Sequence, residues 1–543
     1  MRIFPFIKTI LTNNCNMKII KKTSLGVMLL VMTALFLSSC SSTPDSLKVI
    51  PKDTNLVTSM DVYSIATKGK LTDMSEFSFF KAFNTEIKNE NKKIGKMVDD
   101  LMEDPLSSGL DFTSDLFFFL LDKGQEGTYM CFSIEMNSEK KFTQFVKDLL
   151  KESGAELTIE EAESYKHLNF GGEMAMAWDS EKLVLASPQS YRGRKNLMSQ
   201  IETLISLDKK DQITSNEDFN QFYSKTKDLN FWMSTNIMAD FPGMNQIKDQ
   251  IGFDIKDNQI SAFLDFSTDK ISLKTEFKPN AELQKQMDEY NILNNDFDKD
   301  LLKLFPSNSY MAISASLNPE GYYKLLSKQE SFDVMLKELQ KLYPLDIKEM
   351  FESVSGNMVY TMYTNDEVTE DEVSIPMMGF AFDIKNDKML KELVNNLPAE
   401  AKKGENEFAM EVIPGTSAYI IYDDSKCLIT NDLNSVKAFK ENTPYASKHL
   451  GNSKLAKNLS SNSMYMYMNL DFSSYSSSLK NQIQDSRITS MFDTWSQMAK
   501  SMEMKQINST SNEFIFTTGD DGTNSLYKII STVDKNLNKF APF

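Results

Sequence analysis

The feature that most constrains the fold of this 543-residue sequence is a segment that occurs twice. Residues 129–150 join an alternating apolar stretch to an amphipathic one, and residues 376–397 repeat that pattern without a gap. The aligned pairs are Phe132 with Phe380, Ile134 with Phe382, Glu135 with Asp383, Ser138 with Asn386, Phe142 with Leu390 and Leu149 with Leu397. This repetition predicts an internal duplication.

The repeated segment reads as a strand followed by a helix. Met130, Phe132, Ile134 and Met136 alternate with other residues, which is the period of a half-buried strand. Ser138 stands where a side-chain oxygen can cap the first turn of a helix. The apolar residues that follow recur at helical spacing: Phe142, Phe145, Val146, Leu149 and Leu150. We interpret the segment as a helix packed on a sheet and not as a cofactor site.

Other segments recur in the same order. The matched ranges are 50–62 with 305–317, 116–120 with 358–360, 174–185 with 419–429, and 231–236 with 464–469. Each half is expected to close with a hairpin, 260–266 with 270–277 in the first and 513–517 with 525–530 in the second. Sequential strands joined by hairpins or single helices predict an α+β fold, a tandem duplication whose halves have antiparallel strands with helices packed on one face. We expect the first repeat at 50–290 and the second at 301–543.

The first 39 residues read as an N-terminal extension and a signal peptide. Lys18, Lys21 and Lys22 precede a short apolar run at 26–37, which is the layout of a secretory signal. Met17 is an alternative start, since a complete signal follows it. The sequence Leu37-Ser38-Ser39-Cys40 resembles the lipobox of bacterial lipoproteins. That resemblance implies that Cys40 becomes the N-terminus and carries acyl chains such as palmitate, which would anchor the protein in a membrane.

After Cys40, residues 40–49 are predicted to be a flexible tether, because Ser, Thr and Pro dominate and apolar content is low. Some lipoproteins reach the cell surface through an acidic run after the cysteine, and here only Asp45 is present. We therefore expect an outer-membrane lipoprotein on the periplasmic face.

Charge and cysteine content exclude several classes of partner. Residues 1–39 hold five basic residues and no acidic one, so 54 basic and 76 acidic residues remain, a net charge of −22. Such a chain is not expected to bind nucleic acid or anionic lipid. Cys131 and Cys427 fall in different elements of the two copies, which gives no indication of a disulfide between them. We expect each to be a small buried residue.

Few residues have the chemistry of a catalytic or metal site. Only His167 and His449 are present, and a hydrolase would depend on one of them. Gly171-Gly172 indicates a turn and not a phosphate-binding loop. Asp296, Asp298 and Asp300 imitate the start of a calcium loop, but Leu301 and Ser307 stand where that loop needs Gly and Glu. We therefore expect no catalytic residue, metal or cofactor.

Two stretches of biased composition and the many methionines also need an interpretation. The acidic run at 365–371 occurs in the second copy only, and residues 473–478 are rich in serine; both indicate polar loops. The 33 methionines often share strands with Phe and Tyr. Core packing explains most of them, although adaptable Met-rich surfaces also bind apolar ligands or partner proteins.

A family resemblance rests on several of these motifs. They are the lipobox, Ile50-Pro51-x-Asp53-Thr54, Gly109-Leu110-Asp111 before an apolar strand, and Trp178-Asp179 before Leu183-Val184. Together they resemble a family of Gram-negative lipoproteins known only as domain of unknown function 4836, which implies no catalytic residue or ligand. The favoured hypothesis is a lipid-anchored envelope protein that binds or scaffolds a protein partner without catalysis. The alternatives are a periplasmic carrier of a hydrophobic ligand and a hydrolase that uses His167 or His449.

Overall fold

The chain forms two compact units in the computed structural model, which describes residues 44–71, 76–239, 255–294, 296–328, 332, 334–338, 346–364, 376–413, 415–475, 480, 494, 496–519 and 521–536. Unit 1 consists of Met1–Met233, Ser261–Thr268 and Gly522–Phe543, and unit 2 of Ser234–Ile260 and Asp269–Asp521. This division differs from the predicted boundary near residues 290–301, because residues from the far end of the chain complete unit 1.

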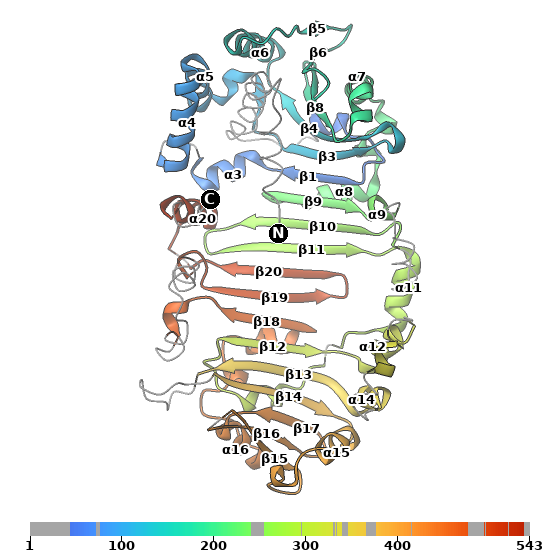
Figure 1. The fold of residues 1–543 in the computed structure, drawn as a ribbon, viewed down its shortest axis with the longest axis vertical. Coiled ribbons are helices and arrows are strands. Elements are labelled where there is room, and N and C mark those ends of the chain that lie inside the picture. The colour runs from blue at the N-terminus through green and yellow to red at the C-terminus, as the bar shows by residue number, and fades with distance from the viewer. Residues whose placement is uncertain are drawn as a thin grey trace. The chain divides into compact units, whose positions relative to one another are not determined.

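Unit 1 is built on an antiparallel sheet (Figure 1). In spatial order its strands are β9 (Leu229–Ser234), β1 (Leu56–Met60), β3 (Leu116–Asp122), β4 (Thr128–Met136), β8 (Lys182–Pro188), β7 (Ala175–Trp178), β6 (Lys166–Asn169) and β5 (Glu160–Glu161). β2 (Leu110–Asp111) pairs with the end of β4, and β10 (Gln259–Phe266) contributes Phe263 to the core. The predicted strand at 129–136 is therefore confirmed as the central strand β4.

Helices cover both faces of this sheet, so the prediction of helices on one face was wrong. α6 (Glu139–Ser153) packs its Phe142 and Val146 against Phe132 and Ile134 of β4. α7 (Tyr191–Ile205) lies on the opposite face, in the core cluster that contains Cys131. The reason is that β4 is apolar at both parities, and each face must be removed from water. As predicted, Ser138 caps α6 by accepting from the N–H of Lys141.

The remaining helices of unit 1 include one from the end of the chain. They are α3 (Val62–Gly69), α4 (Ser78–Glu90), α5 (Lys92–Glu103), α8 (Glu217–Tyr223) and α20 (Ser525–Lys535), with short 3₁₀ turns η3 (Pro105–Ser108), η4 (Gly124–Glu126), η5 (Lys209–Asp211) and η6 (Ile213–Ser215). The predicted strand at 525–530 was wrong, because Asn524 caps a helix there and apolar residues recur at helical spacing. The carboxylate of Asp534 accepts from the N–H groups of Ser78 and Phe79 at the start of α4.

The segment before β1 is folded, which corrects the prediction of a flexible tether through residue 49. The 3₁₀ turn η1 (Asp45–Val49) places Leu47, Val49 and Ile50 in the same core cluster as α7. Ser133 Oγ donates to the carbonyl of Ser46 at 2.9 Å, and the N–H of Asp45 donates to the Glu135 carboxylate. Three apolar side chains in six residues suffice to bury this segment.

The described residues of unit 2 contribute ten antiparallel strands to the sheet. In spatial order its strands are β11 (Lys270–Lys278), β20 (Ser511–Thr517), β19 (Ser501–Asn508), β18 (Met464–Asn469), β12 (Met311–Ser316), β13 (Val354–Tyr363), β14 (Met377–Ile384), β17 (Lys426–Thr430), β16 (Thr416–Tyr422) and β15 (Glu407–Ile413). The closing hairpin of this half is β19 with β20, not 513–517 with 525–530 as predicted.

Helices also lie on both faces of the second sheet. α15 (Lys388–Asn395) packs against Phe382, while α16 (Leu433–Glu441) and the turn η7 (Lys299–Leu304) pack on the face of Ala381. The other helices and 3₁₀ turns are α9 (Asn236–Ala239), α11 (Ala281–Tyr290), α12 (Pro319–Leu326), α14 (Ile347–Ser353), α17 (Ala456–Ser461), η8 (Ala399–Ala401), η9 (Leu450–Asn452) and η10 (Phe472–Ser474).

The two sheets use the same strand register over their central strands. Phe132 pairs with Phe118 and Leu185, and Phe380 pairs with Tyr360 and Ile429. These pairings agree with the alignments predicted for the central strand and the following hairpin. The last matched strand is an exception, since the pairings of Thr58 and Ile313 make Phe231 equivalent to Met466, whereas the sequence alignment matched Met233 with Met466. The shift is two residues, so the side chains stay on the same face.

Candidate functional site

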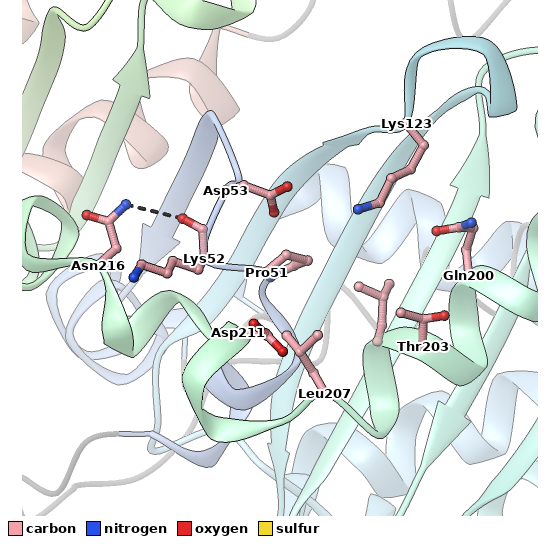
Figure 2. Close-up of a pocket in the computed structure, with 10 residues that line it drawn as sticks. Pro51, Lys52, Asp53, Lys123, Gln200, Thr203, Leu207, Asp211 and Asn216 are labelled. Atoms are coloured by element: carbon pink, nitrogen blue, oxygen red, sulfur yellow. Dashed lines mark hydrogen bonds between the residues drawn. The ribbon is translucent and has the colours of Figure 1, made fainter.

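A hollow of about 590 Å³ lies in unit 1 beside the segment that leads into β1. Figure 2 shows its lining, which comes from the segment before β1, the turn after β3, and α7 with the residues that follow it. The lining residues are Pro51, Lys52, Asp53, Lys123, Gln200, Thr203, Leu204, Leu207, Asp211 and Asn216. The backbone is well fixed here, because Lys52 N–H donates to the carbonyl of Asp211 at 2.7 Å and Asn216 Nδ2 donates to the carbonyl of Lys52 at 3.2 Å.

The chemistry of this hollow is mixed and charged. Lys52 and Lys123 supply ammonium groups, and Asp53 and Asp211 supply carboxylates. A carrier of hydrophobic ligands needs an enclosed apolar space, which these walls do not provide. At the equivalent positions of the second half, Ser307 and Asn308 replace Lys52 and Asp53. Asp53 is part of the family motif in the sequence, but sequence reasoning predicted no hollow here and did not single out Lys123 or Asp211.

Partly buried carboxyl groups lie at the edge of the first core. Asp115 accepts from the hydroxyl of Tyr223 at 2.8 Å, and burial raises its pKa to about 6. Asp61 and Glu135 face the same region, and their negative charges add to the rise. Asp61 itself accepts from the N–H of Ser64 and caps α3. The cluster has structural partners and holds no arranged nucleophile.

A second charged network ties α3 to the loop before β9. Asp228 is buried and accepts from Lys68 Nζ at 2.7 Å, Ser64 Oγ at 2.5 Å and the N–H of Phe266 at 2.6 Å. Lys68 also contacts Asp265 at 3.0 Å. A carboxylate with this many donors is fully satisfied, so the network is structural.

Two of the three aspartates that imitate the start of a calcium loop, Asp298 and Asp300, contact lysines. Lys426 Nζ lies 3.2 Å from Asp298, and Lys303 Nζ lies 2.6 Å from Asp300. Nearby, Asp383 is buried and accepts from Asn357 Nδ2 at 3.0 Å, while its Oδ1 has no hydrogen-bond partner. Burial raises the pKa of Asp383 to about 6. Within the described ranges, His, Cys, Asp and Glu side chains form no group of three able to hold a metal ion.

Neither histidine is arranged as a catalytic base. His167 Nε2 lies 3.6 Å from the Glu160 carboxylate, beyond hydrogen-bond distance, and its buried Nδ1 has no partner. His449 begins the turn η9, where its backbone N–H donates to Asn452 Oδ1 at 3.0 Å, and its Nδ1 is also unpartnered. Burial lowers the pKa of His449.

Gly171 and Gly172 occupy the turn between β6 and β7 with positive φ, which confirms the predicted turn. Cys131 and Cys427 are free and buried, and burial raises the pKa of the Cys427 thiol to about 12. Cys40, the acidic run at 365–371 and residues 476–478 lie outside the described residues. None of the helices described in the structure is both long and apolar enough to cross a bilayer.

The most unusual surface of unit 2 is one face of its sheet, which we call the methionine face. Two rows of cross-strand neighbours cross seven adjacent strands, from β14 to β11. One row is Met378, Met362, Met311, Met468, Met502, Phe516 and Ile271; the other is Phe380, Tyr360, Ile313, Met466, Met504, Phe514 and Leu273. At about 4.8 Å between strands, each row is roughly 30 Å long.

Every residue of the methionine face retains solvent exposure, and none is charged. Met378 is the most exposed of them at 41%. The alternating positions on the same strands, such as Ala312, Val359 and Tyr465, are buried in the core on the opposite face. Among the described residues, Phe380 is the one member of the methionine face that packs against a core cluster. On these strands the methionines therefore lie on a partly exposed face, and most of them do not fill the core.

Comparisons with known proteins identify the family and little more. Two crystal forms of TP0453 match at 9% and 11% identity, over 47% and 48% of this chain and 90% of theirs, with TM-scores of 0.23 and 0.26. A search of curated proteins gave no match. The family model described as Domain of unknown function (DUF4836) matches residues 47–520. The chain therefore belongs to the DUF4836 family, as its motifs predicted.

Proposed function

We propose that this protein is a lipid-anchored, non-catalytic envelope protein that binds a protein partner through the methionine face of unit 2. The main support for this proposal is an uncharged, partly exposed apolar surface that crosses seven strands. Contiguous apolar surface of this extent is typical of interaction sites. Methionine is unbranched and flexible, so such a surface can adapt its shape to the surface of a partner.

The test of partner binding uses crosslinking in cells. A photo-crosslinking amino acid at Met502, in the middle of the face, should capture a specific protein. Replacing Met466 and Met504 with Glu should abolish capture, because burying two unpaired charges in an interface is strongly unfavourable. Ile507→Glu is the control, since Ile507 is 50% exposed near the end of the strand that carries Met504 and belongs to neither row of the methionine face. Capture that survives the Met466→Glu, Met504→Glu double change would contradict the proposal.

The anchor is a proposal of its own, based on the lipobox ending at Cys40. Acylation at this residue would hold the protein at the periplasmic face of the outer membrane. Cys40→Ala should move the protein from the membrane fraction to the soluble periplasmic fraction. An unchanged membrane fraction would refute the anchor without bearing on the methionine face.

We further propose that the two halves arose by duplication. The support is the shared register around Phe132 and Phe380 and the matched turns that follow. In those turns Asp179 Oδ1 accepts from the N–H of Lys182, and Asp423 Oδ1 accepts from the N–H of Lys426. An alignment of the halves in many relatives that fails to preserve these pairings would count against a duplication.

A further inference from the structure

The folded body begins very close to the proposed lipid. Pro44 is already buried, and from Asp45 onward the chain is held by hydrogen bonds and core packing. Only three residues separate Cys40 from Pro44. Even fully extended, the chain allows at most about 14 Å between the Cα atoms of Cys40 and Pro44. This step depends on the proposed acylation of Cys40.

Because of this short distance, the membrane must lie near the end of the unit 1 strands that the segment after Cys40 contacts. Asp45 contacts Glu135, near the end of β4. Lys48 Nζ lies 2.7 Å from Glu181, in the turn between β7 and β8. The opposite end of β4 meets the turn that contains Lys123, beside the charged hollow. Since β4 has nine residues, the two ends are about 26 Å apart.

We infer that unit 1 is oriented on the membrane, with the β7–β8 turn against the lipid surface and the hollow directed into the aqueous phase. The charged side chains near this turn indicate how it contacts the membrane. Lys48 is paired with Asp45 and Glu181, each at 2.7 Å, and Lys182 is paired with Asp179 at 2.6 Å. Because Lys48 and Lys182 are each paired with carboxylates, the β7–β8 turn rests on a zwitterionic headgroup layer without inserting into it or binding anionic lipid.

The test measures the depth of two fluorophores on the full-length acylated protein. Ser180→Cys places a label in the β7–β8 turn, and Gln125→Cys places one in the turn at the other end; both positions are exposed. Cys131 and Cys427 are buried, so they do not compete for the label. In phosphatidylcholine vesicles that contain a headgroup-linked nitroxide quencher, we expect at least about twofold stronger quenching for Ser180→Cys than for Gln125→Cys.

A flexible insertion supplies the control. About 20 Gly and Ser residues between Thr43 and Pro44 should remove the difference in quenching while the protein still floats with the vesicles. Equal quenching of the two labels in protein that floats would overturn the orientation and leave the anchor intact. Protein that does not float would refute the anchor, and the orientation with it.

Discussion

The two units place different side chains on equivalent faces of their sheets. In unit 1, the positions that correspond to the methionine face hold mainly Phe and Leu, including Phe118, Leu120 and Phe132. Phe118 and Met130 are 37% and 49% exposed there. The inner faces remain alike, with Val57 and Ala312 fully buried at equivalent positions. Packing therefore maintains the inner face and the register, while the outer face is free to differ and to specialise.

The first prediction concerns this difference on the outer face. Phe118→Glu in unit 1 should leave partner capture intact, whereas Met466→Glu in unit 2 should reduce it at least about tenfold, as expected when a charge enters an apolar interface. The measurement is the yield of the crosslink from Met502. Equal losses for the two variants would mean that both faces bind the partner, and the proposed specialisation would be wrong.

The second prediction tests whether the turns that open each half contribute equally to the stability of the fold. Leu47 and Leu302 are equivalent, and each is 1% exposed. Leu47→Ala and Leu302→Ala should each lower the free energy of unfolding by about 2 to 5 kcal/mol, through lost burial and a cavity. Chemical denaturation of each variant gives this value. A flexible tether at Leu47 would instead give a change near zero.

The third prediction concerns pH. Asp115 in unit 1 and Asp383 in unit 2 each have a pKa of about 6, above the ordinary 3.8. The folded state therefore binds a proton more tightly than the unfolded chain, and stability is lost as pH rises from about 4 to about 6. Asp115→Asn and Asp383→Asn should flatten this dependence, for Asp115 by on the order of 2 kcal/mol.

Unfolding titrations at a series of pH values from about 3.5 to 7 provide the measurement. Asp383→Asn should also raise stability at neutral pH, because a neutral amide avoids the cost of ionising a buried carboxyl group. A slope identical to that of the unchanged protein would show that these carboxyls ionise normally.

The smallest effect is expected at the surface ion pairs of the same turns. Lys48 contacts two carboxylates, whereas its equivalent Lys303 has one within the turn, Asp300. Lys48→Ala and Lys303→Ala should each cost less than about 1 kcal/mol, with the larger loss at Lys48. Both losses should shrink at high salt. A loss above about 2 kcal/mol at either lysine would contradict their treatment as exposed pairs.

Local patterns were enough to predict central strands such as β4 and the cap at Ser138, because periodicity and capping act within a few residues. The turn η1 was missed, since Leu47, Val49 and Ile50 stand among polar residues and their burial depends on α7. Residues 525–530 were misread as a strand, because their β-branched residues suit either structure and the cap at Asn524 was not recognised.

The candidate sites were harder to predict than the strands. The strand at 464–469 was predicted but β19 was not, and which face of these strands a helix covers is decided by tertiary packing. The hollow likewise joins Lys52, Lys123 and Gln200 from distant parts of the sequence, and no local motif marks it. Such long-range juxtapositions are not encoded in any short stretch.

The packing of α20 in unit 1 has a consequence for the order of folding. Tyr527 and Ile530 pack against the cluster formed by Phe77 and Phe80 of the α4 region. During synthesis the N-terminal strands leave the ribosome first, yet their unit lacks this helix until almost the whole chain has been made. The N-terminal strands thus gain their last packing partner late, which predicts that deletion of α20 destabilises unit 1.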